Sequence, residues 1–259
     1  MTARLAMRGV EIIKAWAEEV GSGDSGYVRT GYMMTADAER LPALEENVAR
    51  LVSWGLDTDR GPVEAGVVVN AAGGWGGALS RSAGVELPIS LRRVQVAFVR
   101  QPADRPQARL TFSDMVSNLV LRPDRAGIAL VVAYQAEQLL AGRDDCEREI
   151  DDVYESSVRS ALRERMPSYV EAEWLGGFAG AYDYTPDWNP ILGWAPGVEG
   201  LYLALGGSGH GFKLAPSIGE AAADAILGRE PRIDVRALDA GRFERGELLR
   251  LAYGPSARA

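Results

Sequence analysis

Cysteine and histidine are nearly absent from this chain of 259 residues, which contains only Cys146 and His210. A single cysteine excludes an internal disulfide framework, and together with one histidine it argues against a metal site built from clustered ligands. No apolar run approaches the ~18 residues that a membrane-spanning helix needs. The first twenty residues alternate charged with apolar side chains and lack the apolar core of a signal peptide. We therefore expect a cytoplasmic protein with no metal site.

An excess of positive charge is also missing. The chain has 28 Lys and Arg residues against 36 Asp and Glu residues, a net charge of −8, which argues against a general nucleic-acid binder. Apolar residues make up 47% of the sequence, enough for a real core in one large or two small domains. Glycine is plentiful instead, with 30 residues, about 12% against a typical ~7%.

The hydrophobic pattern predicts a mixed α/β and α+β architecture, because helices flank both a strand-rich middle and two strands that end in glycines. Successive short apolar runs between about residues 87 and 135 favour an antiparallel sheet. Helices are expected at 3–20, 42–54, 78–84, 147–165, 214–227 and near 237–251, and further strands at 27–34, 66–70, 174–184 and 201–205.

Two glycine-rich segments could match nucleotide-binding loops, and the predicted elements on either side of each segment distinguish the two. Gly21–Gly26 has the spacing G-x-G-x-x-G, but a predicted helix precedes it and a strand follows, the reverse of the dinucleotide-binding order. Gly206–Gly211 has the correct order, since a strand leads in and a helix leaves. His210 and Lys213 beside this loop could act on an anion. A tight turn around a structural histidine, with Lys213 solvated, is the alternative.

A third glycine-rich segment, Ala71–Gly77, follows the buried strand at 66–70. Glycine allows the backbone to approach a ligand closely. Trp75 in this segment could cover a flat ring or could simply fill the core. The residues alone leave both interpretations open.

Several longer stretches together resemble the FAD-dependent amino-acid oxidoreductases of the D-amino-acid oxidase superfamily. The stretches are Val67–Trp75, Leu87–Gln95, Trp174–Gly193 with its Thr-Pro-Asp motif, Gly200–Pro216 with Gly-Ser-Gly-His-Gly-Phe-Lys, and Asp239–Arg245. The nearest branch contains the sarcosine oxidases, dimethylglycine oxidases and proline dehydrogenase β-subunits. The resemblance implies a partial, Rossmann-like FAD-binding domain joined to an antiparallel-sheet substrate domain.

The same resemblance implies a cofactor site. The flavin would lie over the loop before the 214–227 helix, whose positive end would favour the anionic reduced flavin. Gly180 occupies the position where some members carry a cysteine bonded to the flavin, so FAD would be non-covalent. The residues implied to contact the cofactor are Gly73, Trp75, Gly207, Ser208, Gly209, His210, Gly211 and Phe212.

The implied substrate is a small amine or N-substituted amino acid. Lys213 matches the lysine that holds the substrate carboxylate, His210 matches a histidine of the flavin and substrate pocket, and Tyr182 matches a tyrosine lining the substrate cavity. His210 and Lys213 are thus the residues implied to act in catalysis. The reaction would be hydride transfer from the amine-bearing carbon to flavin, followed by hydrolysis of the imine.

Two features of the family pattern are missing. The resemblance starts downstream of the strand–G-x-G-x-x-G–helix unit that holds the FAD pyrophosphate, and only about a dozen residues separate Gly55 from Val67, where the family has a long segment. We therefore expect a chain truncated at its N-terminus and shortened internally. Either a partner chain supplies the dinucleotide-binding half, or the gene start and interior are misassigned, or the chain is a remnant without FAD.

These expectations divide the chain into parts with distinct roles. Residues 1–56 and 86–180 would form the substrate-type domain, residues 57–85 and 181–230 the partial FAD-binding domain, and residues 231–259 a C-terminal tail or helix. The main functional hypothesis is an FAD-dependent oxidoreductase. The alternative is a non-catalytic domain that binds a small acid or a partner.

Overall fold

The computed structural model describes residues 65–101, 103–104, 110–114, 116–124, 127–133 and 138–249. The elements expected within residues 3–54 and the loop at 21–26 lie outside these ranges. The described residues divide into two units. The first unit contains residues 65–89 and 188–248, and the second contains residues 90–187 and 249. Which unit binds cofactor and which binds substrate stays a prediction.

The first unit is built on a three-stranded sheet whose order is β1-β9-β8. Its strands are β1 (Val68–Asn70), β8 (Ile191–Trp194) and β9 (Leu201–Leu205). β1 and β9 run parallel, with Asn70 opposite Leu203, whereas β8 is antiparallel to β9. β9 is buried over most of its length because both faces of the sheet are covered, which explains its continuous apolar run.

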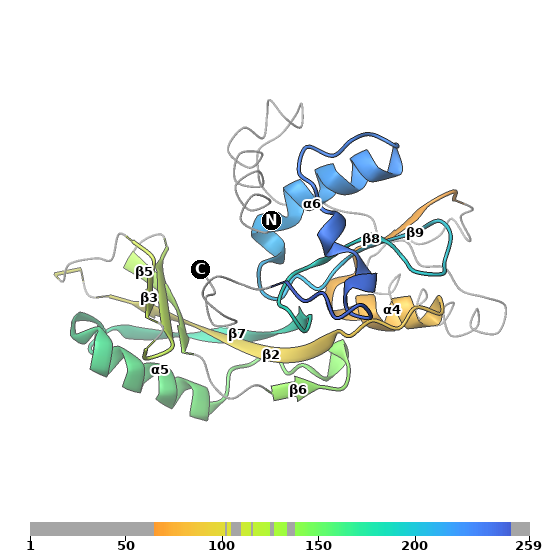
Figure 1. The fold of residues 1–259 in the computed structure, drawn as a ribbon. Helices are drawn as coiled ribbons and strands as arrows, with labels where there is room; N and C mark the ends of the chain where they lie inside the picture. Colours follow the sequence, from red (N-terminus) through yellow and green to blue (C-terminus); the bar gives the residue numbers. More distant parts are fainter. Residues whose placement is uncertain are drawn as a thin grey trace. The chain divides into compact units, whose positions relative to one another are not determined.

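Two helices follow the two parallel strands directly. A short 3-10 turn, η1 (Gly73–Trp75), leads into α4 (Gly76–Ser82), and α6 (Gly211–Ile226) follows β9. α6 packs against β8 and β9, as Figure 1 shows. The core beneath the sheet is apolar and consists of Val85, Ile191, Ala195, Leu201, Leu203, Leu205 and Ala240.

The C-terminal segment differs from the helix expected near 237–251. It forms two 3-10 turns, η5 (Arg236–Leu238) and η6 (Ala240–Arg242), as far as residue 249. Asp239 between them is extended, with ψ 151°, and therefore interrupts any continuous helix. Arg242 is almost fully buried and donates to the carbonyl oxygens of Leu238 and Asn189 at 2.8 and 2.9 Å. These bonds tie the segment to the turn before β8.

The second unit contains a six-stranded antiparallel sheet, which confirms the prediction for residues 87–135. Its strands are β2 (Ser90–Arg100), β3 (Phe112–Asp114), β4 (Leu119–Pro123), β5 (Ile128–Ala133), β6 (Gln138–Leu140) and β7 (Glu173–Tyr184). The order is β3-β4-β5-β2-β6, and β7 pairs with β2. Alternate residues of β5 are buried, the pattern of a sheet with one face on the core.

The helix α5 (Asp152–Arg165) covers that face of the sheet (Figure 1). It begins five residues later than predicted, because Asp151 is extended and its carboxylate accepts the N–H of Tyr154 at 2.7 Å as an N-cap. Short 3-10 turns, η3 (Arg143–Asp145) and η4 (Pro167–Tyr169), flank α5. The core between helix and sheet includes Ala97, Val99, Leu119, Leu121, Val131, Tyr154, Val158 and Leu162.

Candidate functional site

Two glycine-rich loops lie at one edge of the first unit's sheet. The parallel strands β1 and β9 end at Asn70 and Leu205, and each continues into a glycine loop and then a helix. The carboxyl ends of adjacent parallel strands meet at the same sheet edge, which is where open α/β sheets bind ligands. The structure therefore brings together the segments 71–77 and 206–211, which are more than a hundred residues apart in the sequence.

The first loop is held by the side chain of Asn70, which is 1% exposed. Its amide donates to the carbonyl oxygen of Gly76 and to the hydroxyl of Ser80, both at 2.9 Å. Its Oδ1 accepts the N–H of Ala72 at 3.2 Å. One buried side chain thus clamps both ends of the loop and the start of α4, a role that the sequence analysis missed.

The start of α4 packs against the end of β9 at Gly76. This residue is buried, and a Cβ at its position would collide with the side chain of Leu205, the last residue of β9. Only glycine lets α4 start this close to β9. The end of β9 and the start of α4 are consequently locked together, which places the Gly206 loop beside the Gly73 loop.

The second loop depends on left-handed backbone conformations. The φ angles of Gly206, Ser208 and Gly209 are 70°, 48° and 81°. Ser208 is buried, and its hydroxyl donates to the carbonyl oxygen of Gly206 at 3.1 Å, while the N–H of His210 donates to Gly207 at 2.7 Å. A short polar side chain with its own local hydrogen bond can tolerate positive φ. The loop is therefore a defined turn that delivers the chain into α6.

The N-terminus of α6 has features suited to an anion or a polar ring edge. Its first turn contains no acidic residue, and no side chain caps it. The first N–H groups of a helix have no partner within the helix, and their combined dipole is positive. Lys213 lies in this first turn and is half-buried, and burial lowers the pKa of its ammonium group. Two sources of positive potential thus coincide at this loop.

The remaining residues predicted for the cofactor differ in exposure. Phe212 is 89% exposed and Trp75 is 47% exposed, so neither side chain fills the described core. Trp75 is therefore not a core residue of the described part of the chain. His210 is half-buried, and its Nδ1 is shielded from solvent. These residues and Gly73 all lie in the first unit.

Tyr182, by contrast, lies in the second unit. It occupies β7 directly opposite Arg92 of β2, and its ring centroid lies 6.2 Å from that of Tyr184. Gly180 is opposite Val94, and a Cβ at this glycine would meet no described atom within 4 Å. The side of β7 that carries Tyr182 therefore also has open space next to it.

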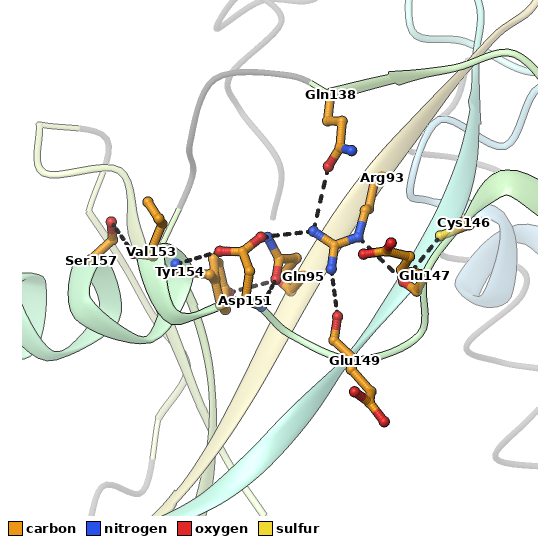
Figure 2. Close-up of polar contacts among 10 residues, drawn as sticks. All are labelled: Arg93, Gln95, Gln138, Cys146, Glu147, Glu149, Asp151, Val153, Tyr154 and Ser157. Atoms are coloured by element: carbon orange, nitrogen blue, oxygen red, sulfur yellow. Dashed lines mark hydrogen bonds and ion pairs between the residues drawn. The ribbon is translucent and has the colours of Figure 1, made fainter.

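Arg93, the neighbour of Arg92, holds a polar network that Figure 2 shows. Its side chain is 4% exposed and pairs with Asp151 at 2.9 Å. The guanidinium also donates to Gln138 at 3.4 Å, to the carbonyl oxygen of Glu147 at 3.3 Å and to that of Glu149. Arg93 therefore fastens β2 to β6 and to the segment before α5.

The carboxylate of Asp151, at the start of α5, accepts several of the hydrogen bonds in this network (Figure 2). Burial alone would raise its pKa, but hydrogen bonds from the Tyr154 N–H, Arg93 and Gln95 outweigh burial and lower the pKa. Gln95 exchanges two hydrogen bonds with Asp151, at 2.7 and 3.0 Å. The donors and acceptors of this network bond to one another, so the network stabilises the fold of the second unit.

The Thr-Pro-Asp motif has a similar structural role. Thr185 and Asp187 are both buried, and the Thr185 hydroxyl donates to Asp187 at 3.2 Å. The other carboxylate oxygen of Asp187 accepts the N–H of Leu249 at 3.1 Å. The motif therefore stabilises a turn and anchors the C-terminal end of the described chain.

The first-unit loops have room for a flat ligand such as a flavin. A Cβ built at Gly73 or at Gly211 meets no described atom within 4 Å, so open space adjoins both loops. The backbone N–H groups of the α6 first turn and the exposed Trp75 supply donors and an aromatic surface. These features fit the polar edge and the flat ring of an isoalloxazine. No group of His, Cys, Asp or Glu that could hold a metal occurs among the described residues.

Comparison with known proteins identifies the family of this chain. The family profile DAO, described as FAD dependent oxidoreductase, matches residues 50–225, which is more than half of the chain. FAD-dependent oxidoreductase domain-containing protein 1 of Mus musculus is 32% identical over 210 residues, covering 73% of this chain and 41% of that protein. Glycine oxidase of Pseudomonas aeruginosa is 28% identical over 251 residues, covering 88% of this chain and 66% of that protein.

The fold also has solved relatives. The crystal structure of L-proline dehydrogenase from P. horikoshii superposes with a TM-score of 0.70 at 21% identity, covering 95% of this chain and 84% of that one. This likeness shows the fold, and it confirms the mixed architecture with an antiparallel sheet. The chain spans 41% and 66% of the lengths of the mouse and Pseudomonas proteins it matches. No described helix is both long enough and apolar enough to cross a membrane.

Proposed function

Since this chain belongs to the DAO family of FAD-dependent oxidoreductases, we propose that it oxidises a small amine or N-substituted amino acid, with FAD bound non-covalently. The observation that carries the proposal is the pair of glycine loops at the ends of β1 and β9, together with the bare N-terminus of α6. The alternative, a non-catalytic domain that binds a small acid or a partner, differs from this proposal in that it would not bind FAD. A cytoplasmic location and a partner chain stay predictions.

The proposed cofactor residues divide by chemistry. The backbone of the loop from Gly207 to Gly211 and the first turn of α6 would face the polar edge of the flavin, because their N–H groups and helix dipole favour negative charge there. Trp75 and Phe212 would offer aromatic surface, and Gly73 would allow close approach. Bound flavin supplies two-electron oxidation chemistry that no side chain possesses.

The proposed substrate residues are Lys213, His210 and Tyr182. A half-buried ammonium with few competing waters binds a carboxylate more strongly than an exposed one does. His210 immediately precedes α6 and would orient the substrate or hold a proton at its imidazole. Tyr182 would line the substrate cavity through its ring and hydroxyl. Gly180 offers no nucleophile, which supports a non-covalent cofactor.

Glycine is the first substrate to test, because a glycine oxidase is among the relatives and is matched over most of this chain. Sarcosine, dimethylglycine and proline follow, since the sequence resembles the branch that oxidises them. All four carry a carboxylate next to the amine-bearing carbon. A single ammonium at the site therefore suffices to orient any of them.

The decisive experiment measures FAD binding by visible absorbance after gel filtration, for the wild type and two matched variants. Gly211 and Gly219 both lie in α6, and a Cβ at either would meet no described atom within 4 Å. Gly211→Ala fills the space assigned to the flavin, whereas Gly219→Ala adds a methyl group farther along the helix. Overpacking typically costs 1–3 kcal/mol, so we expect Gly211→Ala to weaken FAD binding about 5- to 150-fold.

The Gly219→Ala variant should bind FAD as the wild type does, since alanine in a helix interior is about 1 kcal/mol more favourable than glycine. Equal FAD affinity in both variants would mean that the flavin does not lie over α6. A wild-type protein that leaves gel filtration colourless would contradict the proposed function and favour the domain that binds a small acid or a partner.

A further inference from the structure

The short segment before α5 binds both β2 and β7, which are neighbouring strands of the second unit. Arg93 of β2 donates to the carbonyl oxygen of Glu147 at 3.3 Å and to that of Glu149 (Figure 2). The carbonyl oxygen between these two, that of Arg148, accepts the N–H of Ala179 in β7 at 2.7 Å. Three successive carbonyl groups therefore attach one segment to both strands.

These attachments lie next to Tyr182 in the sheet. Arg93 is paired with Ala181, the residue before Tyr182, and Ala179 lies three positions before it. Tyr182 is paired with Arg92, the neighbour of Arg93, and side chains alternate between the two faces along a strand. The segment before α5 therefore holds the backbone that carries Tyr182 from the face opposite the tyrosine side chain.

Side-chain packing contributes little to the position of β7 at this point. The three residues before Tyr182 are Ala179, Gly180 and Ala181, whose side chains are a methyl group or absent. Glycine also leaves the backbone conformationally free, and a Cβ at Gly180 would meet no described atom within 4 Å. Hydrogen bonds from outside the strand therefore have a large share in fixing this part of β7.

The Arg93 guanidinium is itself held in one orientation. Its side chain is 4% exposed and pairs with Asp151 at 2.9 Å. Gln95 donates to the same carboxylate at 2.7 Å and accepts the N–H of Asp151 at 3.0 Å. A guanidinium presents its donors in a fixed planar fork, so several bonds orient it together. A hydrogen-bond network of this kind makes the structure around it rigid.

We infer that Arg93 is a positioning residue for the proposed reaction. Through the segment before α5 it fixes the backbone of β7, and thereby the place of the Tyr182 side chain in the substrate cavity. The inference rests on the proposed function, which assigns Tyr182 to that cavity. Arg93 acts without touching substrate, because its buried guanidinium lies on the other face of the sheet. A displacement of about 1 Å in a catalytic site can cost about 100-fold in rate.

A double-mutant cycle on kcat/KM tests the inference in FAD-loaded protein, with whichever of glycine and sarcosine the wild type oxidises faster. Arg93→Gln removes the guanidinium fork, and Tyr182→Phe removes the hydroxyl group. We expect each substitution to lower kcat/KM about 10-fold, the effect of one lost hydrogen bond. The double variant should also lose about 10-fold rather than about 100-fold, because a misplaced hydroxyl has no further effect to lose.

Arg165→Gln is the matched control. Arg165 lies in α5 and pairs with Asp114 of β3, so its replacement removes another ion pair between helix and sheet in the same unit and changes the net charge equally. Its effect on kcat/KM should add to that of Tyr182→Phe. Hydrogen exchange gives a readout without turnover, since the amides at 179–182 should exchange faster in Arg93→Gln and as in the wild type in Arg165→Gln.

If Arg93→Gln does not fold, Arg93→Lys takes its place in the cycle, because lysine keeps a charge for Asp151 but lacks the fork that joins two carbonyl groups. Additive effects of the Arg93 and Tyr182 substitutions, or unchanged exchange at 179–182, would overturn the inference while the proposed function stands. A wild type that oxidises neither substrate would overturn the proposed function, and Arg93 would then be a structural residue only.

Discussion

Replacing Asn70 tests whether one side chain holds the first glycine loop. Asn70→Ala removes the donors to Gly76 and Ser80 and the acceptor for Ala72, three hydrogen bonds in all. A buried hydrogen bond contributes about 1 kcal/mol net, and groups left unsatisfied add to the loss. We therefore expect the free energy of unfolding of the first unit to fall by about 3 kcal/mol.

A double-mutant cycle isolates the contact with Ser80, whose hydroxyl is fully buried. Ser80→Ala alone should cost about 1 kcal/mol, and the double variant should cost about 1 kcal/mol less than the sum of the single variants. Ser82→Ala is the control, because this exposed hydroxyl donates to the nearby Leu79 carbonyl at 2.7 Å and does not bond to Asn70 in the pattern of Ser80. Its effect should stay within about 0.5 kcal/mol.

Denaturant unfolding followed by tryptophan fluorescence gives the global free energies, and hydrogen exchange of the amides at 71–82 reports the loop itself. Faster exchange confined to these amides in Asn70→Ala would locate the loss at the loop and the start of α4. Additive effects of Asn70→Ala and Ser80→Ala, or an Asn70→Ala variant as stable as Ser82→Ala, would refute the proposed clamp. FAD affinity should fall as the loop becomes less ordered, and neither Asn70→Ala nor Ser80→Ala should restore it.

Two further predictions concern charged groups. Hydrogen bonds from the Ser117 hydroxyl and the Val116 N–H, with a further contribution from Arg165, lower the pKa of Asp114 to about 2. A lowered folded pKa means that this stabilisation is present above pH 3.8 and is lost as the pH falls toward 2; Asp114→Asn should therefore flatten the acid limb of a stability–pH curve, and an unchanged limb would contradict the assignment. Lys213→Met should raise the KM for sarcosine at neutral pH, and in the wild type the KM should begin to rise at a lower pH than an ordinary lysine would allow, because burial lowers the pKa of this ammonium; a pH-independent KM would remove Lys213 from carboxylate binding.

Local sequence patterns predicted much of the fold, because hydrophobic periodicity and turn-forming residues depend on neighbours in the sequence. The strand at 201–205, the glycine loop after it and a following helix were all expected from residue order, and the structure confirms them. The predicted start of that helix was three residues late. Gly211–Lys213 contains no capping side chain, so nothing in the sequence marked where α6 begins.

Two short strands were not predicted, because pairing with another strand is what makes each of them a strand. β8, with four residues, follows Pro190 and is a strand only because Ile191–Trp194 pairs with β9. β6, with three residues, likewise exists through its pairing with β2. The segment 147–151 has helix-like polarity but is not helical, because the carbonyls of Glu147 and Glu149 accept from Arg93 and Asp151 caps the helix that follows. No window of sequence contains these interactions.

The sequence by itself determined the kinds of groups available: two glycine loops after buried strands, a lysine and the lone histidine beside one of them, and a family resemblance that the profile match confirms. Tertiary structure alone decided which groups meet. The parallel pairing of β1 with β9 brought both loops to one edge, and the register of β2 with β7 set Arg92 beside Tyr182 while it buried Arg93. The reason is that strand pairing joins residues distant in sequence, and a side chain's face depends on a register that only the complete sheet establishes.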